Sequence, residues 1–393
     1  MDPIQNPFAP GAGSMPPQLA GRERVREQVR IALERARLGR PARSVLMVGL
    51  RGVGKTVLLD RLRLDAEASG IRTLRLEAPE GRSLPALLAP ELRVALLKLS
   101  RVERARALAQ RALAGLASFT RALKVKFEDI EVGLDFEPEP GLADNGDLRH
   151  DLQALLAAAG QAARKADSVL AIFIDELQYV REEELADLIV ALHRMAQDGA
   201  PVILVGAGLP QLRGRLGEAK TYAERLFDFP ELGPLSPEDS RLALKQPIED
   251  EGARITDEAL ETIVELTRGY PYFIQEWGKQ VWDCTLSSPI DGDDVELATV
   301  AATTALDQGF FRVRFDRLTP HEKSYLRAMA TLGPGTQRSG DIAAALGREV
   351  TSLGPIRAQL IAKGLIWSPA HGATAFTVPL FDEFLLRIMP KIP

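Results

Sequence analysis

Residues 49–56 have the types and the spacing that a phosphate-binding loop needs. They read Gly-Leu-Arg-Gly-Val-Gly-Lys-Thr and match the pattern G-x-x-x-x-G-K-[ST] at every position. Glycines let the backbone curl so that successive N–H groups point at phosphate oxygens, Lys55 adds a positive charge, and the Thr56 hydroxyl can bind Mg²⁺. The sequence therefore predicts a site for ATP and Mg²⁺, against the alternative of a turn that only resembles this pattern. The predicted nucleotide contacts in this loop are Gly49, Leu50, Arg51, Gly52, Val53, Gly54, Lys55, Thr56 and Val57.

Two acidic residues, Asp175 and Glu176, directly follow the apolar run 169–174. Such a run is typical of a buried strand, and ligands bind at the carboxyl ends of the strands in an open α/β sheet. We predict that Asp175 binds Mg²⁺, usually through a water molecule, and that Glu176 orients and deprotonates the attacking water. The alternative is that both acids only cap a helix. Because a metabolite kinase needs no water-activating glutamate there, the pair favours ATP hydrolysis.

These residues need a sheet to position them, and the neighbouring segments indicate one. Ser44 to Val48 has the β-branched and apolar composition of a strand, and the residues from Val57 onward have the composition of a helix. Further strands are predicted at Arg72–Leu76, Val169–Ile174, Val202–Val205 and Leu226–Phe229, with helices such as Glu182–Gln197 between them. Strands that alternate with helices indicate a mostly parallel sheet with helices on both faces. The predicted fold class is therefore α/β, with a P-loop NTPase sheet.

The chain is predicted to contain an arm and three domains. Residues 1–18 are rich in Pro, Gly and Ala and should form an irregular arm without regular structure, followed by the ATPase domain over residues 19–235. A serine, a proline and two acids at 236–239 have the residue types of a helix start and open an α-helical lid domain over residues 236–306. A capping box at 319–322 opens the last domain, over residues 307–393.

The last domain has the predicted element order of a winged helix, with a recognition helix from Thr351 to Lys363. Arg357, Gln359 and Lys363 are the polar residues of that helix with the reach to touch DNA. Residues 311–393 contain eleven Lys and Arg residues and six acidic residues, which gives this segment a net charge of +5. Because the whole chain has a net charge of -5, the rest of the chain has a net charge of -10. This polarity suits contact with double-stranded DNA, and it also suits a winged helix that docks a protein.

A basic insertion, from Leu92 to Lys126, contains nine Lys and Arg residues. Its charges form either a solvated helix face or a surface for a partner or nucleic acid. Residues 124–136 alternate in a way that predicts a small strand or hairpin.

The bulk composition is that of an ordinary globular protein, with 46% hydrophobic and 26% charged residues. Cys284 is the single cysteine, which excludes an intrachain disulfide and a cysteine-based zinc site. No stretch reaches the ~18 consecutive apolar residues of a membrane span, and the first residues lack the layout of a signal peptide. We therefore expect a cytoplasmic protein without membrane contact.

Together, these motifs resemble the AAA+ class of P-loop ATPases, near the archaeal and bacterial initiator-like (origin-recognition-like) and STAND ATPases. The resemblance covers about residues 18–390 and implies ATP or ADP as ligand, Mg²⁺ as cofactor and a capacity to form homo-oligomers. The segment 19–23, Leu-Ala-Gly-Arg-Glu, is similar to the family segment beside adenine, which assigns Gly21 and Arg22 to the nucleotide. The segment 205–212 is similar to a family element after the fourth strand, but with glycine and alanine in place of a polar sensor, so that Gln211 is the nearest substitute.

Two further residues are assigned by the same resemblance. Arg225 stands where the family carries an arginine that reaches the ATP of a neighbouring subunit, and a surface salt bridge is its alternative role. Pro271 belongs to a segment similar to the "GxP" element of STAND ATPases, whose helix start lies over the nucleotide. The aromatic residues Tyr272, Phe273 and Trp277 near it are alternatively plain core of the helical domain.

We therefore expect an ATP-hydrolysing AAA+ switch coupled to DNA through the winged helix, with Lys55, Glu176 and Arg225 as catalytic residues. The alternative is a nucleotide-gated scaffold with little turnover that recruits a protein partner. A metabolite kinase is a third reading, which the two additional domains disfavour.

Overall fold

The computed structural model describes residues 1–11, 13–79, 81–124, 137–219 and 223–391. These residues form two compact units, which we describe separately. The first unit contains residues 22–49 and 55–232, and the second contains residues 1–21, 50–54 and 233–393. The predicted strand or hairpin at 124–136 lies outside the described residues, apart from Lys124.

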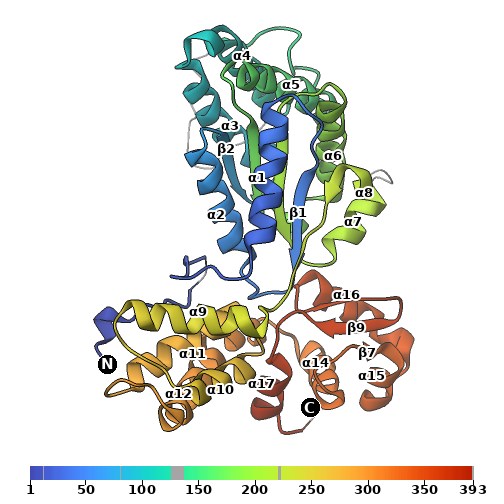
Figure 1. Cartoon of the computed structure of the whole chain (residues 1–393). Helices are drawn as coiled ribbons and strands as arrows, with labels where there is room; N and C mark the ends of the chain where they lie inside the picture. Colours follow the sequence, from blue (N-terminus) through green and yellow to red (C-terminus); the bar gives the residue numbers. More distant parts are fainter. Residues whose placement is uncertain (12, 80, 125–136, 220–222, 392–393) are drawn as a thin grey trace. The chain divides into compact units, whose positions relative to one another are not determined.

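The first unit is built on a parallel sheet, as predicted (Figure 1). Its strands are β1 (Ser44–Gly49), β2 (Arg72–Glu77), β3 (Leu170–Asp175), β4 (Val202–Gly208), β5 (Phe227–Asp228) and β6 (Glu231–Leu232). They lie in the order β2-β3-β4-β1-β5, with β6 also paired to β1. Every residue of β1, β3 and β4 is buried, which explains their continuous apolar sequences. This order places β4 between the strand before the phosphate loop and the strand that ends in Asp175.

Helices cover both faces of the sheet (Figure 1). On one face lie α1 (Glu23–Arg37) and α2 (Lys55–Ala68), which pack on each other and on β4. On the other face lie α3 (Leu84–Ser100), α4 (Arg106–Ala122), α5 (Leu148–Lys165) and α6 (Glu182–Gln197), whose apolar sides share one hydrophobic cluster with the sheet. Two short helices, α7 (Leu212–Ala219) and α8 (Ala223–Leu226), follow β4.

The basic insertion forms the end of α3, the 3-10 turn Glu103–Ala105 and α4. The apolar residues of these helices, such as Leu96 and Leu113, are fully buried in the sheet cluster. The basic residues Lys98, Arg104, Arg106 and Arg121 are exposed. Exposed basic side chains fit a solvated helix face and a surface for a partner or nucleic acid equally well, so both alternatives for this segment stay open.

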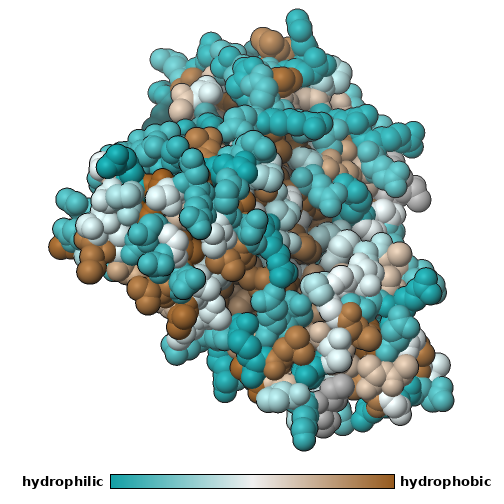
Figure 2. Space-filling view, turned by 60° about the horizontal axis from the view of Figure 1, so that its bottom comes forward, coloured by the Kyte–Doolittle hydropathy of each residue, from teal (hydrophilic) through white to brown (hydrophobic). Residues whose placement is uncertain are grey.

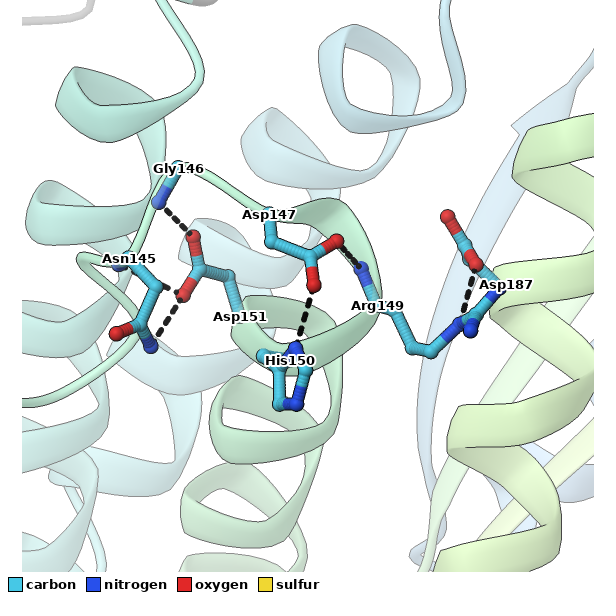
Figure 3. A network of polar contacts seen from close by, with 7 residues as sticks. All are labelled: Asn145, Gly146, Asp147, Arg149, His150, Asp151 and Asp187. Atoms are coloured by element: carbon cyan, nitrogen blue, oxygen red, sulfur yellow. Dashed lines mark hydrogen bonds and ion pairs between the residues drawn. The ribbon is translucent and has the colours of Figure 1, made fainter.

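The start of α5 is fixed by a network of polar contacts around two aspartates (Figure 3). The buried carboxylate of Asp151 accepts hydrogen bonds from the backbone N–H groups of Asn145 (3.0 Å) and Gly146 (2.9 Å). Asp147 caps the helix by accepting from the N–H of Arg149, whose guanidinium pairs with Asp187 of α6 at 2.9 Å. The network therefore anchors α5, the helix that leads into β3, against α6.

The second unit begins with four helices and continues into a small mixed domain. The helices are α9 (Pro237–Asp250), α10 (Asp257–Thr267), α11 (Pro271–Cys284) and α12 (Gly292–Ala305), followed by a π-helix at Leu306–Phe311 and by α13 (Arg312–Phe315). Ser236 caps α9 by accepting from the N–H of Asp239 at 3.1 Å, as the residue types at this position predict. This helix continues through Pro247 to Asp250.

The final domain has the order helix, strand, helix, helix and two strands. Its elements are α14 (Pro320–Leu332), β7 (Gln337–Arg338), α15 (Ser339–Leu346), the 3-10 turn Val350–Leu353, α16 (Gly354–Ala362), β8 (Ile366–Trp367), β9 (Ala373–Phe376) and α17 (Phe381–Ile388). The strands form an antiparallel sheet in the order β7-β9-β8. Its core is continuous with that of the four helices, because Phe311 contacts Phe381 and Phe384 at ring-centroid distances of 5.8 and 5.2 Å.

The N-terminal arm contacts α11. It contains a short 3-10 helix, Pro3–Gln5, and the indole N–H of Trp282 donates to the carbonyl oxygen of Asp2 at 2.9 Å. Phe8 is 3% exposed and lies against Gly278, where a Cβ atom would stand 2.6 Å from the ring. Burial of this ring, with the backbone bonds around it, outweighs the weak local preferences of the arm.

Figure 2 shows one face of the molecule, which is mainly hydrophilic with small groups of apolar side chains. Within the described residues, no helix has both the length and the apolar character that a membrane crossing requires.

Candidate functional site: the phosphate loop and the acidic pair

The phosphate loop leaves β1 at Gly49 and enters α2 at Lys55. Gly52 and Gly54 have φ angles of +81° and +84°, which glycine adopts at low cost and other residues rarely do. Lys55 is 7% exposed, and its ammonium group donates to the carbonyl oxygen of Gly49 at 3.0 Å. The conformation therefore favours glycine at Gly54, which the pattern specifies, and at Gly52, which stands at a variable position of the pattern, and it holds the lysine beside the loop.

The tip of the loop, residues 50–54, belongs to the second unit and is hydrogen bonded within it. The backbone N–H of Arg51 donates to the carbonyl oxygen of Thr377 at 3.2 Å, and the Nε of Arg51 donates to the carbonyl oxygen of Gly364 at 3.2 Å. Thr377 directly follows β9, and Gly364 lies between α16 and β8. The final domain thus touches the phosphate loop through two carbonyl groups, contacts that nothing in the sequence indicates.

The helix start predicted to lie over the nucleotide also contacts this loop. Pro271 is the first residue of α11, and the N–H of Tyr272 donates to the carbonyl oxygen of Gly52 at 3.2 Å. Phe273 and Trp277 are 1% and 3% exposed, so they belong to the core of the helical domain, which was the alternative role given for them. The assignment of Pro271 to the nucleotide remains a prediction, and the structure places this residue next to the loop.

Asp175 is buried at the carboxyl end of β3 and accepts hydrogen bonds from the Thr56 hydroxyl and from the N–H of Glu176, the latter at 2.8 Å. Burial raises the pKa of the Asp175 carboxyl, and the charge of Glu176 acts in the same direction, whereas Thr56 and Lys55 oppose the change. A hydroxyl and a carboxylate in contact are the hard oxygen ligands that Mg²⁺ prefers. The residues therefore fit Mg²⁺, whose charge would offset the cost of burying Asp175.

Glu176 follows with a φ of +52°, an uncommon left-handed conformation for a residue other than glycine. Its side chain accepts a hydrogen bond from the amide of Gln178, a buried residue that the sequence analysis did not single out. An amide two residues beyond the acidic pair is the sequence feature that could have indicated it. Such uncommon backbone conformations are concentrated at functional sites.

The remaining predicted site residues lie in both units. Gly21 has a φ of +68° and lies against Asp239 of α9, where a Cβ atom would stand 2.5 Å from the carboxylate. Arg22 is 7% exposed and precedes α1. Arg225 lies in α8, is exposed, and forms no ion pair with any residue that the structure describes. The salt-bridge alternative for Arg225 is therefore not seen within the described chain.

Two of the three residues expected to reach DNA are engaged inside the final domain. The guanidinium of Arg357 donates to the Thr374 hydroxyl at 3.0 Å and to the carbonyl oxygen of Ala373 at 3.0 Å. Lys363 donates to Glu322 at 2.7 Å, whereas Gln359 is exposed. Arg357 and Lys363 thus form bonds within the domain. A sequence cannot distinguish this role from a contact with DNA, because both roles use long basic side chains.

A parallel sheet in this strand order, with a glycine-rich loop after β1 and two acids after β3, defines a P-loop nucleotide-binding fold. Residues 18–205 match the family described as AAA ATPase domain. Residues 308–385 match a domain of unknown function (DUF8462). No curated protein matches the sequence.

Solved structures with a similar fold include the Walker-type ATPase PABY2304 of Pyrococcus abyssi. It has a TM-score of 0.58 and 17% identity, over 93% of this chain and 96% of that chain. The RuvB Holliday junction branch migration motor of Thermotoga maritima has a TM-score of 0.46 and 18% identity, over 95% and 97%. The Orc1 protein of Aeropyrum pernix in complex with DNA has a TM-score of 0.47 and 16% identity, over 95% and 94%. At 17% identity, the similarity to PABY2304 supports a common fold and nothing further.

The contact between Lys363 and Glu322 gives a pH-dependent prediction. Burial acts to raise the pKa of Glu322, but the bonds from Lys363 and Thr319 outweigh it, and the net pKa is lowered. A lowered carboxyl pKa contributes stability that is present above the unfolded pKa and is lost as the pH falls through the folded pKa. Lys363→Met should therefore lower the free energy of unfolding by about 1–3 kcal/mol at pH 7, because a buried carboxylate loses a partner.

Urea denaturation of both proteins at several pH values measures this difference, which should shrink as the pH falls below about 4. Lys245→Met is the matched control, since Lys245 and Glu249 form a half-exposed pair at 3.8 Å on α9. An equal loss of stability in both variants, or a loss independent of pH, would contradict the assigned role of Lys363.

Proposed function

We propose that the protein is a Mg²⁺-dependent ATP-hydrolysing switch. One observation carries this proposal: Thr56 at the end of the phosphate loop donates a hydrogen bond to Asp175, next to Glu176 and with Lys55 buried nearby. The two motifs are far apart in the sequence, and their contact joins a phosphate-binding element to an acidic pair. A structural turn or a simple helix cap would not require this contact.

Each residue then has a defined role. Lys55 and the backbone N–H groups of the loop would bind the phosphate oxygens, while Thr56 and Asp175 would hold Mg²⁺, which supplies positive charge at the phosphates. Glu176 would accept the proton of the attacking water. Gly21, Arg22 and Pro271 would contribute to the nucleotide site by analogy with the family.

ATP hydrolysis by the full chain is the direct test. Lys55→Ala and Glu176→Gln should each abolish Mg²⁺-dependent phosphate release, whereas Glu176→Gln should still bind ATP, because the change leaves the phosphate contacts in place. Lys245→Ala, at a half-exposed position of α9, and Glu182→Gln, at an exposed position of α6, are matched controls. If the wild-type protein binds ATP but neither catalytic substitution changes phosphate release, the assigned enzyme activity is incorrect.

We also propose that nucleotide binding is transmitted to the final domain. The loop tip is hydrogen bonded to Thr377 and Gly364 through Arg51, and to Tyr272 through Gly52. The Tyr272 ring stacks on Phe310 of the π-helix at a centroid distance of 4.6 Å. A loop that closes on phosphate would change these bonds, so the π-helix and the final domain would respond to the nucleotide.

We propose that residues 320–388 form a winged helix, on the order of their helices and strands, with double-stranded DNA as its partner. The local charge balance of +5 supports the DNA partner, because phosphate contacts supply most non-specific affinity. The second candidate is a nucleotide-gated scaffold that recruits a protein. The engagement of Arg357 and Lys363 within the domain favours this alternative, since it leaves fewer basic side chains for phosphates.

DNA titration at several salt concentrations distinguishes the two partners. If DNA is the partner, affinity should fall steeply with salt, and Arg338→Ala or Arg348→Ala should reduce the slope of log K against log salt by about 1 each. Arg338 in β7 and Arg348 after α15 are both exposed, so their loss should leave stability unchanged. A slope near zero, or a slope that neither substitution alters, would favour the scaffold.

We propose, finally, that Arg225 acts on the nucleotide of a second copy of the chain. Its exposure and its lack of an ion pair among the described residues leave its charge available for a contact outside the chain. A cation supplied in this way would neutralise charge that develops on the transferred phosphate.

A mixing experiment tests this role. Arg225→Ala alone should lower phosphate release by about 10³-fold, as removal of such an arginine does in other P-loop proteins. Arg225→Ala and Lys55→Ala would each be inactive alone, but a mixture should regain activity, because one copy supplies the intact site and the other supplies Arg225. Arg213→Ala, an exposed arginine of α7, serves as the control for the loss of charge. Full activity of Arg225→Ala would contradict the proposal.

A further inference from the structure

Gln178 connects the side chain of Glu176 to the end of β4. It lies in the 3-10 turn Leu177–Tyr179 that follows β3, and it is 6% exposed. Its Oε1 accepts a hydrogen bond from the backbone N–H of Leu209 at 3.1 Å. Its Nε2 donates to Oε2 of Glu176. A single buried amide therefore joins the predicted water-activating carboxylate to the neighbouring strand.

The direction of this amide is determined by its surroundings. A backbone N–H can only donate, so the group that faces Leu209 must be the amide oxygen. The amide nitrogen consequently faces Glu176, and an N–H donor suits an ionised carboxylate, which can only accept. The bond occupies Oε2 of Glu176 and leaves Oε1 outside it.

Glycine at position 208 makes room for the amide. A Cβ atom on Gly208 would lie 2.9 Å from Oε1 of Gln178 and 2.8 Å from Cδ2 of Leu212. The end of β4 thus lacks a polar side chain of its own at this position. The space next to the acidic pair is filled instead by the amide of Gln178.

Arg215 of α7 holds the same turn from the other side. Its guanidinium donates to the carbonyl oxygens of Gln178 and of Val180, the latter at 3.1 Å. The backbone of Gln178 is therefore hydrogen bonded to α7, and its side chain is hydrogen bonded to the end of β4. Since residues 209–211 join β4 to α7, the two elements that bond to this turn are consecutive in the chain.

We propose that Gln178 is a positioning residue that fixes the carboxylate of Glu176 for its reaction with water, with Arg215 holding the turn in place. This inference rests on the proposed ATP hydrolysis. Glu176 has a left-handed backbone and a flexible side chain, so the bond from Gln178 restricts where its carboxylate lies. Gln178 itself bonds to Glu176 and Leu209, so it sets the orientation of the carboxylate and takes no proton.

Two substitutions separate the two bonds of Gln178. Gln178→Met keeps the size of the side chain and loses both bonds. Gln178→Glu keeps an oxygen that accepts from Leu209 but presents a like charge to Glu176 instead of a donor. If positioning is the role, both variants should lower kcat by about 10- to 100-fold, since small misplacements of a catalytic group have effects of this size.

The affinity for ATP should stay within about two-fold of wild type, because Gln178 bonds to Glu176 and is not among the residues assigned to the nucleotide. Only the reaction with water, which needs the positioned carboxylate, should be slowed. Binding of a fluorescent ATP analogue with Mg²⁺ measures this affinity, and steady-state phosphate release measures kcat. Gln246→Met is the matched control, because the Gln246 amide donates to Asp250 at 2.8 Å on the exposed side of α9.

The outcomes separate the two proposals. If wild type releases no phosphate, the proposed function fails. If wild type is active and Glu176→Gln is not, but both Gln178 variants keep the wild-type kcat, the positioning role is overturned. It is also overturned if only Gln178→Met loses activity, or if ATP affinity falls as much as kcat, since Gln178 would then only support the fold. Loss of kcat in both variants with unchanged ATP affinity supports it.

Discussion

A carboxylate buried at the end of a parallel sheet is the constraint on which the candidate site depends. Asp175 ends a strand that is buried along its whole length, and burial raises its pKa. Bonds from Thr56 and from the N–H of Glu176 offset part of that cost, and a divalent cation would offset more. The Thr56 bond also connects the end of β3 to the first turn of α2. One buried charge therefore explains why the phosphate loop and the acidic pair belong to the same site.

The phosphate loop is contacted by parts of the chain that are remote in sequence. Its tip groups with the second unit, where Arg51 bonds to Thr377 and Gly364 and where Gly52 bonds to Tyr272. The stacking of Tyr272 on Phe310 continues this chain of contacts into the π-helix. Because π-helices are rare and are frequently found at functional sites, this segment is a suitable place for a conformational change to begin.

The acidic pair has its own support, which comes from the strand next to it. Gln178 bonds to Glu176 and to the end of β4, and Arg215 holds the turn from α7. Gly208 ends β4, and a Cβ atom at this position would lie 2.9 Å from Oε1 of Gln178. The small residue at the end of β4 thus leaves room for the buried amide beside the acidic pair.

Local sequence patterns were sufficient for the parallel sheet, for most helices and for the phosphate loop. The limits of α6 agree with the predicted helix Glu182–Gln197, whose apolar residues recur at helical spacing. Other elements were missed for physical reasons. The strand β7 has two residues, too few for an alternating pattern, and α17 begins after Leu380 without a side-chain cap. α9 continues through Pro247 because its packing outweighs the lost backbone bond.

The sequence by itself therefore identified the residues of the candidate site. The glycines, Lys55, Thr56, Asp175 and Glu176 are recognisable from their types and spacing. Only the tertiary structure decided which groups support that chemistry. The bonds from Gln178 to Leu209, from Arg51 to Thr377 and from Lys363 to Glu322 join segments that no local pattern relates. They form because buried polar groups must find partners, and those partners are selected by packing in three dimensions.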